Sequence, residues 1–404
     1  MDVSNLSLET NQNATSNTHN QLPSKPPVTR MEYFGRHGEL LKIHLVNLFL
    51  NIITIGIYSF WGKTRIRKYM TSHITLKKDR FEYTGTGKEL LIGWLKAMVI
   101  FLPLIIALSI PVVNLIAFPI FFGILSIAIF LALRYRLSRS RWRGIRFNLG
   151  GSIKEYFVLS LIRTGKNIIS LGWRIPKSDI VRWTYIANHM TYGDLKFSYN
   201  GDYKRLQKIH AITLGIFIAS MIVGFSFLFM SGFTQGMERL KDSRATQEQT
   251  MSQPELQYDE EGYPIIDEQT QSDVVGEEPK LEKSMVVGII LMYMGIGIGF
   301  LGRMWYQAAL WQEKFRGLRL ANLRFKSDVT GKGLAKLFIT NMLIIIFSLG
   351  LAKPIALQRT LKYYIANMRL AGDLDELIAK QREAQEKSGM GDALAADVGF
   401  DMGM

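Results

Sequence analysis

The chain has 404 residues, a formal net charge of +15 and no cysteine. The absence of cysteine excludes disulfide bonds, thiolate metal sites and thiol nucleophiles. The positive charge could suggest a nucleic-acid-binding protein, but an excess of lysine and arginine in a membrane protein more often marks its cytoplasmic side. The apolar segments of the chain favour the second explanation, and we expect no nucleic-acid partner.

The first 30 residues are polar and rich in asparagine, and they lack the apolar stretch of a signal peptide. We expect them to form a disordered tail.

Four segments are apolar and long enough to cross a membrane. Residues 93–133 contain Lys96 as their only charge and have the length of two spans, with Pro111 near the position of the turn. Residues 209–233 and 285–309 form a third and a fourth span. No ordinary soluble core requires four such segments. The sequence therefore predicts a multi-pass membrane protein with two transmembrane hairpins.

The charged residues predict which side each loop faces. Residues 234–284 contain thirteen acidic and five basic residues, whereas 61–90, 134–154 and 174–208 are basic. Because lysine and arginine are retained on the cytoplasmic side, we expect the acidic loop to be external.

Three weaker apolar segments, 40–60, 157–173 and 335–352, have basic residues at both ends. They either re-enter the membrane with both ends in the cytoplasm or cross it with an imperfect charge bias. The charges favour the first alternative.

These three segments look like copies of one another. Each is an apolar helix that stops at a glycine, where we expect the backbone to turn, and the glycines are Gly56, Gly172 and Gly350. A basic amphipathic stretch follows, with the composition of a helix that lies on an anionic membrane surface. Pro176 and Pro354 suit the first turn of that second helix, and Phe60 stands there in the first copy. A tyrosine follows each glycine after thirteen or fourteen residues: Tyr69, Tyr185 and Tyr364.

Short aromatic stretches that end at a glycine flank the copies, and their alternating pattern predicts strands. They are residues 32–38, 80–87, 145–151, 195–201 and 323–331. We expect them to form small cytoplasmic β-hairpins, or one sheet, that hold the copies together. The third copy lacks a closing strand, because the residues after Gly372 predict a charged helix. The predicted fold is mainly α: a polytopic membrane protein with three internal repeats and short cytoplasmic β-hairpins.

The predicted elements divide the chain into tails, repeats and transmembrane hairpins. The segments are the tail 1–30, repeat 1 at 31–90, hairpin 1 at 91–133, repeat 2 at 134–205, hairpin 2 at 206–310, repeat 3 at 311–380 and the C-terminal tail 381–404.

The stretch "GELLKIHLVNLFLNIITIGIYSFWGKTRIRKY", with "DRFEYTGTGKELLIGWL" after it, resembles the YjgN family of bacterial inner-membrane proteins. The resemblance is strongest over residues 33–95, and the two weaker copies extend it to about residue 375. It implies a multi-pass protein of the bacterial inner membrane, so the acidic loop would be periplasmic. It implies no activity and carries over no catalytic residue.

Polar residues in the weak segments are the best candidates for a functional site. Nine residues before the repeated glycine stand Asn47, Arg163 and Asn341, and five before it stand Asn51 and Asn167. They could line a polar path for a solute or ion, because polar groups at membrane depth usually face a cavity, a partner helix or water. Alternatively, they could form hydrogen bonds between helices that hold the copies together.

The basic residues after the first two repeated glycines could contact anionic lipid headgroups: Arg65, Arg67, Lys68 and Arg182. They could also be topology signals alone. The six histidines have no metal-binding spacing, and we find no nucleophile or acid–base pair that would indicate an enzyme. We therefore expect neither a metal nor a cofactor. The sequence suggests a transport or channel-like protein or, alternatively, a non-enzymatic membrane scaffold that contacts anionic lipids.

Overall fold

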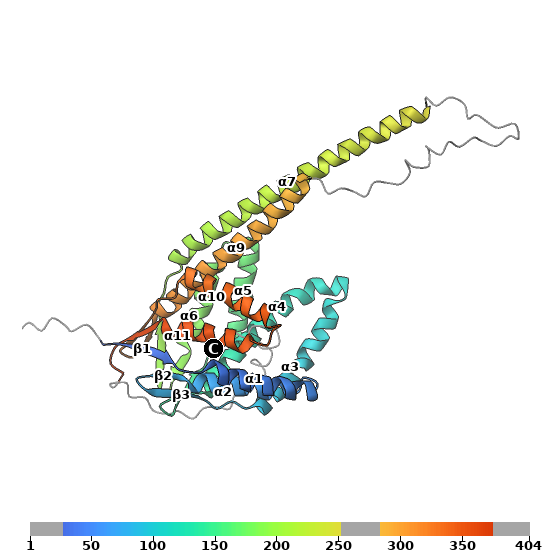
Figure 1. Cartoon of the computed structure of the whole chain (residues 1–404). Helices are drawn as coiled ribbons and strands as arrows, with labels where there is room; N and C mark the ends of the chain where they lie inside the picture. Colours follow the sequence, from blue (N-terminus) through green and yellow to red (C-terminus); the bar gives the residue numbers. More distant parts are fainter. Residues whose placement is uncertain (1–26, 252–282, 375–404) are drawn as a thin grey trace, which may run out of the picture.

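The structure is a computed structural model that describes residues 27–251 and 283–374 (Figure 1). In these residues a β-barrel carries five helical hairpins, and the longest of them, formed by α7 (Lys204–Met251) and α9 (Lys283–Arg316), extends far from the barrel.

Ten short antiparallel strands close the barrel in the described ranges. Each strand pairs with its two neighbours in the chain, and β1 closes the ring by pairing Val28 with Ala371 of β10. The odd-numbered strands are β1 (Val28–Tyr33), β3 (Asp79–Tyr83), β5 (Ile145–Leu149), β7 (Leu195–Tyr199) and β9 (Leu323–Ser327). The even-numbered strands are β2 (Ile74–Leu76), β4 (Ser140–Trp142), β6 (Met190–Tyr192), β8 (Leu318–Leu320) and β10 (Met368–Ala371).

A helical hairpin leads from each odd-numbered strand to the next strand. Three hairpins are short: α1 (His37–Ile53) with α2 (Ser59–Ser72), α5 (Ile153–Ile169) with α6 (Ile175–Asn188), and α10 (Gly331–Phe347) with α11 (Lys353–Ala366). The long hairpins are α7 with α9 and α3 (Gly87–Leu108) with α4 (Pro111–Arg139). The order strand, helix, helix, strand thus occurs five times.

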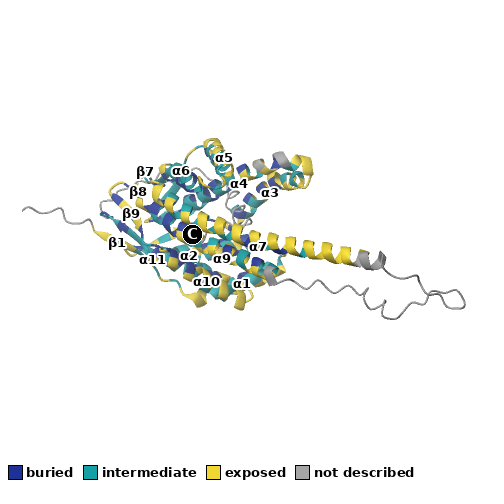
Figure 2. Cartoon of the chain, turned by 90° about the horizontal axis from the view of Figure 1, so that it is seen from above, coloured by how far each residue is buried: buried dark blue, intermediate teal, exposed yellow. Residues whose placement is uncertain are grey.

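Four helices in the described residues are long and apolar enough to cross a membrane. These segments are Gly87–Leu108, Ile120–Arg139, Lys204–Ala245 and Met285–Arg316, and they fall in the two long hairpins. At most a third of each apolar stretch is buried in the isolated chain, and α7 is largely exposed, as its yellow stretch shows in Figure 2. The acidic segment 234–284 is not a loop throughout, because α7 continues to Met251; residues 252–282 lie outside the described residues.

The barrel is filled by side chains. Four odd-numbered strands have a phenylalanine at the same position, between exposed or partly exposed polar neighbours: Phe81, Phe147, Phe197 and Phe325. Phe197 is buried in the main hydrophobic core, and the other three are partly buried and pack against it. The rings of Phe81 and Phe147 are 6.4 Å apart, and those of Phe197 and Phe325 are 6.1 Å apart. Because side chains in a strand alternate between two faces, the charged neighbours lie on the outside of the barrel.

The expectation of a mainly α fold with separate short β-hairpins is wrong, because the strands form one closed barrel. The five predicted aromatic stretches overlap the odd-numbered strands, but all the even-numbered strands were missed. These contain only three or four residues, which is too short for a strand pattern to be recognised. The third copy does have a closing strand, β10, which pairs with β9 and β1.

The second helix of each short hairpin does not extend away along a surface. It folds back antiparallel to the first helix and ends next to the barrel; for example, α1 starts after β1, α2 ends before β2, and Met31 pairs with Leu76. Both ends of each short hairpin therefore lie on the same side of its turn, as the re-entrant alternative requires.

Candidate functional site

The turns of the three short hairpins share one backbone geometry. The N–H of each repeated glycine bonds to the carbonyl oxygen five residues earlier, with N···O distances of 2.8 Å for Gly56, 2.7 Å for Gly172 and 2.8 Å for Gly350. The φ angles of these glycines are +90°, +84° and +86°. This hydrogen bond is typical of a Schellman motif, so the three predicted hinges are the helix ends themselves.

An exposed apolar residue precedes each of these glycines. Ile55, Leu171 and Leu349 have φ angles of 49°, 47° and 51°, and their exposed fractions are 93%, 88% and 92%. A left-handed conformation costs an L-residue roughly 1–2 kcal/mol, and Ile is especially unfavourable there because it is β-branched. Glycine would avoid this cost. We call these three positions the hairpin tips. Each tip thus has an apolar side chain although its left-handed backbone conformation favours glycine.

Three of the predicted polar residues form hydrogen bonds to the other helix of their own hairpin. The Asn47 amide donates to the carbonyl oxygen of Gly62 at 3.2 Å, and the Asn341 amide donates to that of Ala356 at 3.1 Å. Asn167 and Ser178 hydrogen-bond at 2.7 Å. In the described part of the chain, no hydrogen bond brings these side chains together across hairpins. These contacts are hydrogen bonds between helices, as in the alternative that the polar residues hold the copies together.

A few buried polar atoms without a hydrogen-bond partner in the described residues favour the alternative of a polar path. The Oδ1 atoms of Asn47, Asn51 and Asn341 are buried and accept no hydrogen bond from the residues that the structure describes. Arg163 is partly buried, and its Nε is likewise without an acceptor there. A buried acceptor without a donor costs about 1–3 kcal/mol, so these groups could bind a polar solute.

The predicted lipid-contacting residues differ in exposure. Arg65 and Lys68 are exposed on α2, whereas Arg67 is buried, which contradicts a lipid-facing position for this residue. Arg182 is partly buried, and its Nη2 donates to the Thr164 hydroxyl at 2.8 Å within its own hairpin. Only two of the four side chains thus face outward freely.

A tyrosine ties the two helices of four hairpins together at the barrel; the sequence pattern found two of these tyrosines but not their contact with the first helix. Tyr69 of α2 donates to Glu39 of α1 at 2.9 Å, and Tyr135 of α4 donates to Glu89 of α3 at 2.7 Å. Each tyrosine stands five residues before the next strand; the four are Tyr69, Tyr135, Tyr185 and Tyr363. Burial is the main cause that raises the pKa of Tyr69, and its bond to Glu39 adds to it. We call the contact of each of these four tyrosines with the start of the first helix of its hairpin the tyrosine clasp.

The third tyrosine of the predicted repeat is therefore Tyr363, not Tyr364. Tyr363 accepts a hydrogen bond from the backbone N–H of Thr330 at 3.1 Å, as Tyr69 does from Arg36 at 2.9 Å. Counting thirteen residues from every repeated glycine would have found it.

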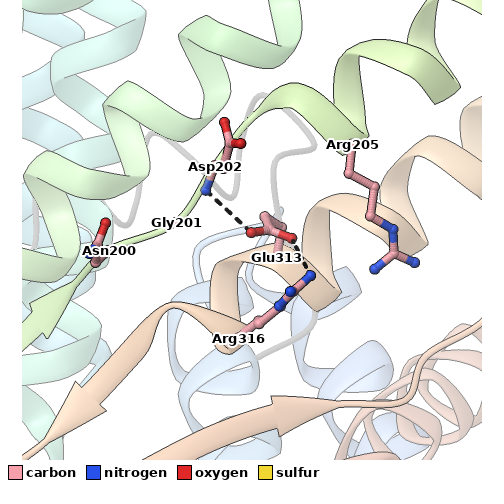
Figure 3. Close-up of a pocket in the computed structure, with 6 residues that line it drawn as sticks. All are labelled: Asn200, Gly201, Asp202, Arg205, Glu313 and Arg316. Atoms are coloured by element: carbon pink, nitrogen blue, oxygen red, sulfur yellow. Dashed lines mark hydrogen bonds and ion pairs between the residues drawn. The ribbon is translucent and has the colours of Figure 1, made fainter.

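The fifth hairpin, formed by α7 and α9, has Glu313 at the clasp position (Figure 3). Its side chain is 7% exposed, and Oε1 accepts a hydrogen bond from the backbone N–H of Asp202 at 3.3 Å. A cavity of about 330 Å³ lies beside it, lined by Asn200, Gly201, Asp202, Arg205, Glu313 and Arg316. Among the described residues, no cluster of three His, Asp or Glu side chains could hold a metal ion.

The comparisons with known proteins identify a family and its relatives. The model of a family described as "Bacterial protein of unknown function (DUF898)" matches residues 28–397. The chain belongs to this family. It is 22% identical over 381 residues to the inner membrane protein YjgN of Escherichia coli O157:H7, which covers 88% of this chain and 92% of the relative. The protein of the same name from Salmonella typhimurium strain LT2 is 28% identical over 128 residues, which cover 30% of this chain and 32% of the relative. No solved structure matches the chain.

Proposed function

We propose that the protein is a non-enzymatic scaffold of the bacterial inner membrane that contacts anionic lipids and inserts its three hairpin tips into one leaflet. The relatives are named inner membrane proteins, and the two long hairpins supply four helices that are able to span the bilayer. The excess of lysine and arginine in the loops supports a cytoplasmic barrel and a periplasmic acidic segment.

The observation that carries the proposal is the apolar side chain at each tip. Ile55, Leu171 and Leu349 are almost fully exposed, and each keeps an unfavourable backbone conformation. In water, the exposed apolar side chain and the left-handed backbone conformation of such a residue would both be unfavourable for the stability of the protein. In a leaflet the apolar side chain is favourable, by roughly 25 cal/mol for each Å² removed from water, and this gain can offset the backbone cost.

The length of the short hairpins supports insertion into a single leaflet. A helix of 17 residues, such as α1, is about 25 Å long, and Leu40 near its start is already buried against α2 and α11. The remainder is too short to cross a hydrocarbon core of about 30 Å. Exposed basic residues soon follow two of the tips, Arg174 after Leu171 and Lys353 after Leu349. Such side chains can reach headgroups, where each charge contributes about 1 kcal/mol of attraction to anionic lipid.

A polar path is the second candidate function, and the buried Oδ1 atoms of Asn47, Asn51 and Asn341 favour it. The filled barrel offers it no passage along the barrel axis, so such a path would run among the hairpins. Cysteines placed at these three positions would react with small water-soluble thiol reagents in a path and would be protected in packed interhelical contacts.

The absence of native cysteine makes the tip hypothesis directly testable. Single cysteines at Ile55, Leu171 and Leu349, labelled with an environment-sensitive fluorophore, should report an apolar surrounding in reconstituted vesicles. Nitroxide lipids of one leaflet should quench the label, and anionic vesicles should strengthen the effect. A label at Lys196, which is exposed on the outside of the barrel, is the control and should remain in water. Tip labels that report water in every vesicle would refute the proposal.

A further inference from the structure

The hairpin of α7 and α9 departs from the tyrosine clasp at two equivalent positions. Five residues before the strand that closes the hairpin, four hairpins have tyrosine and this one has Glu313. Six residues after the strand that opens the hairpin, three hairpins have glutamate and this one has Arg205. A neutral phenol bound to a carboxylate is thus replaced by a carboxylate and a guanidinium group, and both line the cavity of Figure 3.

Glu313 is poorly satisfied for a buried carboxylate. Its two contacts in the described residues are long: 3.3 Å from Oε1 to the backbone nitrogen of Asp202, and 3.9 Å from Oε2 to Nη1 of Arg316. Charge-assisted hydrogen bonds are normally about 2.7–2.9 Å long, and a buried charge is costly without close partners. The carboxylate can therefore accept a stronger donor from a ligand in the cavity.

The guanidinium groups around the cavity compensate this carboxylate only weakly, because the ion pair of Glu313 with Arg316 is long, at 3.9 Å. Arg205 turns to the side-chain oxygen of Gln312, to which Nη2 donates at 3.0 Å, and the Arg316 side chain is 69% exposed. The cavity lining therefore carries a carboxylate and two guanidinium groups that no short hydrogen bond joins to it. Its volume of about 330 Å³ is at the lower end of the range for small-ligand sites, about 300–1,000 Å³.

We propose that this cavity binds a zwitterionic ligand that carries a phosphate and a primary ammonium group, as phosphoethanolamine does. The phosphate is bound by Arg205 and Arg316, and the ammonium group donates to Glu313. Arginine suits the phosphate because its planar fork can donate two parallel hydrogen bonds. The ligand is either the headgroup of a lipid or a free solute of the same chemistry.

The place of the cavity suits a lipid headgroup. Arg205 lies in the first turn of α7, and the exposed apolar side chains of Ile212 and Ile216 follow on the same helix. Seven residues of helix span about 10 Å, so acyl chains would begin along α7 within reach of a headgroup at Arg205. The site does not depend on the hairpin tips, since it belongs to a different hairpin.

Binding to the purified full-length protein tests the proposal. Native mass spectrometry in detergent would measure the dissociation constants of phosphatidylethanolamine, phosphatidylglycerol and phosphatidylcholine, and calorimetry would measure that of soluble O-phosphoethanolamine. We expect the ethanolamine-containing ligands to bind at least tenfold more tightly than the other two lipids. Equal binding of lipid and soluble ligand would identify a free solute, and binding of the lipid alone would identify a headgroup site. No preference for ethanolamine would overturn the proposal.

Variants distinguish this cavity from lipid binding elsewhere. Glu313→Gln and Arg205→Gln should each weaken ethanolamine-ligand binding at least tenfold, whereas Lys204→Gln, next to the cavity lining, should not. The double variant Glu313→Tyr with Arg205→Glu restores the pair found in three other hairpins; it should fold at least as stably and lose the preference. Unchanged binding in all these variants would overturn the assignment, even if the tips insert as proposed.

Discussion

Asn341 of α10 donates a hydrogen bond to the carbonyl oxygen of Ala356 in α11, and its Nδ2 lies 3.1 Å from that oxygen. Asn47 makes the same bond to Gly62 in the first hairpin, again across fifteen residues. Each of the two hydrogen bonds joins the two helices, or arms, of its hairpin, and both lie at the same distance from the turn. The small residues opposite, glycine and alanine, leave room for the amide.

Replacing Asn341 by alanine should destabilise the third short hairpin by about 1 kcal/mol, which is typical of one net interhelical hydrogen bond. The loss can be measured from unfolding in mixed micelles at increasing SDS fraction. Ile339→Ala, at an exposed position two residues earlier, is the control and should change stability by less than half as much. Equal losses in both variants would show that the amide bond is not what holds the arms.

Leu349→Gly should separate stability from membrane contact. Glycine adopts the left-handed conformation at no steric cost, so we expect the hairpin in detergent to gain about 1 kcal/mol. The same variant should insert less well, and a fluorophore on the neighbouring Phe347, replaced by cysteine, should report a wetter surrounding. Leu349→Asn, which also tolerates this conformation, should behave alike. A glycine variant that loses stability and inserts normally would contradict the role of the tip.

Two glycines of α9 offer a matched test of how it packs on α7. A Cβ atom at Gly295 would lie 2.5 Å from the Ser220 hydroxyl, whereas one at Gly297 would meet nothing within 4 Å. Gly295→Ala should therefore cost roughly 1–3 kcal/mol through overpacking, and Gly297→Ala should be neutral or favourable by up to about 1 kcal/mol. Unfolding in mixed micelles measures both. Equal effects would show that the two helices are not in close contact at Gly295.

The sequence predicts the helices and turns of this fold better than its barrel. The spans follow from uncharged stretches such as 93–133, and the hairpin turns follow from Gly56, Gly172 and Gly350, because length and glycine are local signals. Strands of three residues give no such signal, since their stability comes from pairing with neighbours far away in the chain. For that reason the prediction found the odd-numbered strands and missed the closed ring.

The candidate site was predictable only in part, for a related reason. The polar positions Asn47 and Asn341 were recognised from their spacing, but the partner across each hairpin depends on how the arms fold back. The tyrosines of the short hairpins can be counted from the repeated glycines, but Tyr135 and Glu313 in the long hairpins can be assigned only after the strands are placed, since their equivalence is counted from the strands. The long hairpin then becomes comparable with the short ones.

The barrel should show a specific sensitivity to alkaline pH. Burial raises the pKa of Tyr33 to about 12, although a hydrogen bond from Gln358 partly opposes this effect. The unfolded value is near 10, so the folded state retains this proton more strongly. Its contribution to stability is complete below pH 10 and is lost as the pH rises from 10 towards 12. Absorbance at 295 nm should show several tyrosines that ionise late, because burial also raises the pKa of others such as Tyr192, and Tyr33→Phe should lower their number by one. Ionisation of every tyrosine near pH 10 in the folded protein would contradict this prediction.

The exposed positions of the barrel should all be accessible from the same side of the membrane. Arg30 on β1 and Lys77 in the turn between β2 and β3 flank the first short hairpin and are exposed. Cysteines at either position should react with a membrane-impermeant thiol reagent in inside-out vesicles and not in intact spheroplasts, because lysine and arginine are retained in the cytoplasm. A cysteine at Glu260 in the acidic segment should show the opposite pattern. If Arg30 and Lys77 reacted from opposite sides, the first hairpin would cross the bilayer, and insertion into one leaflet would be excluded.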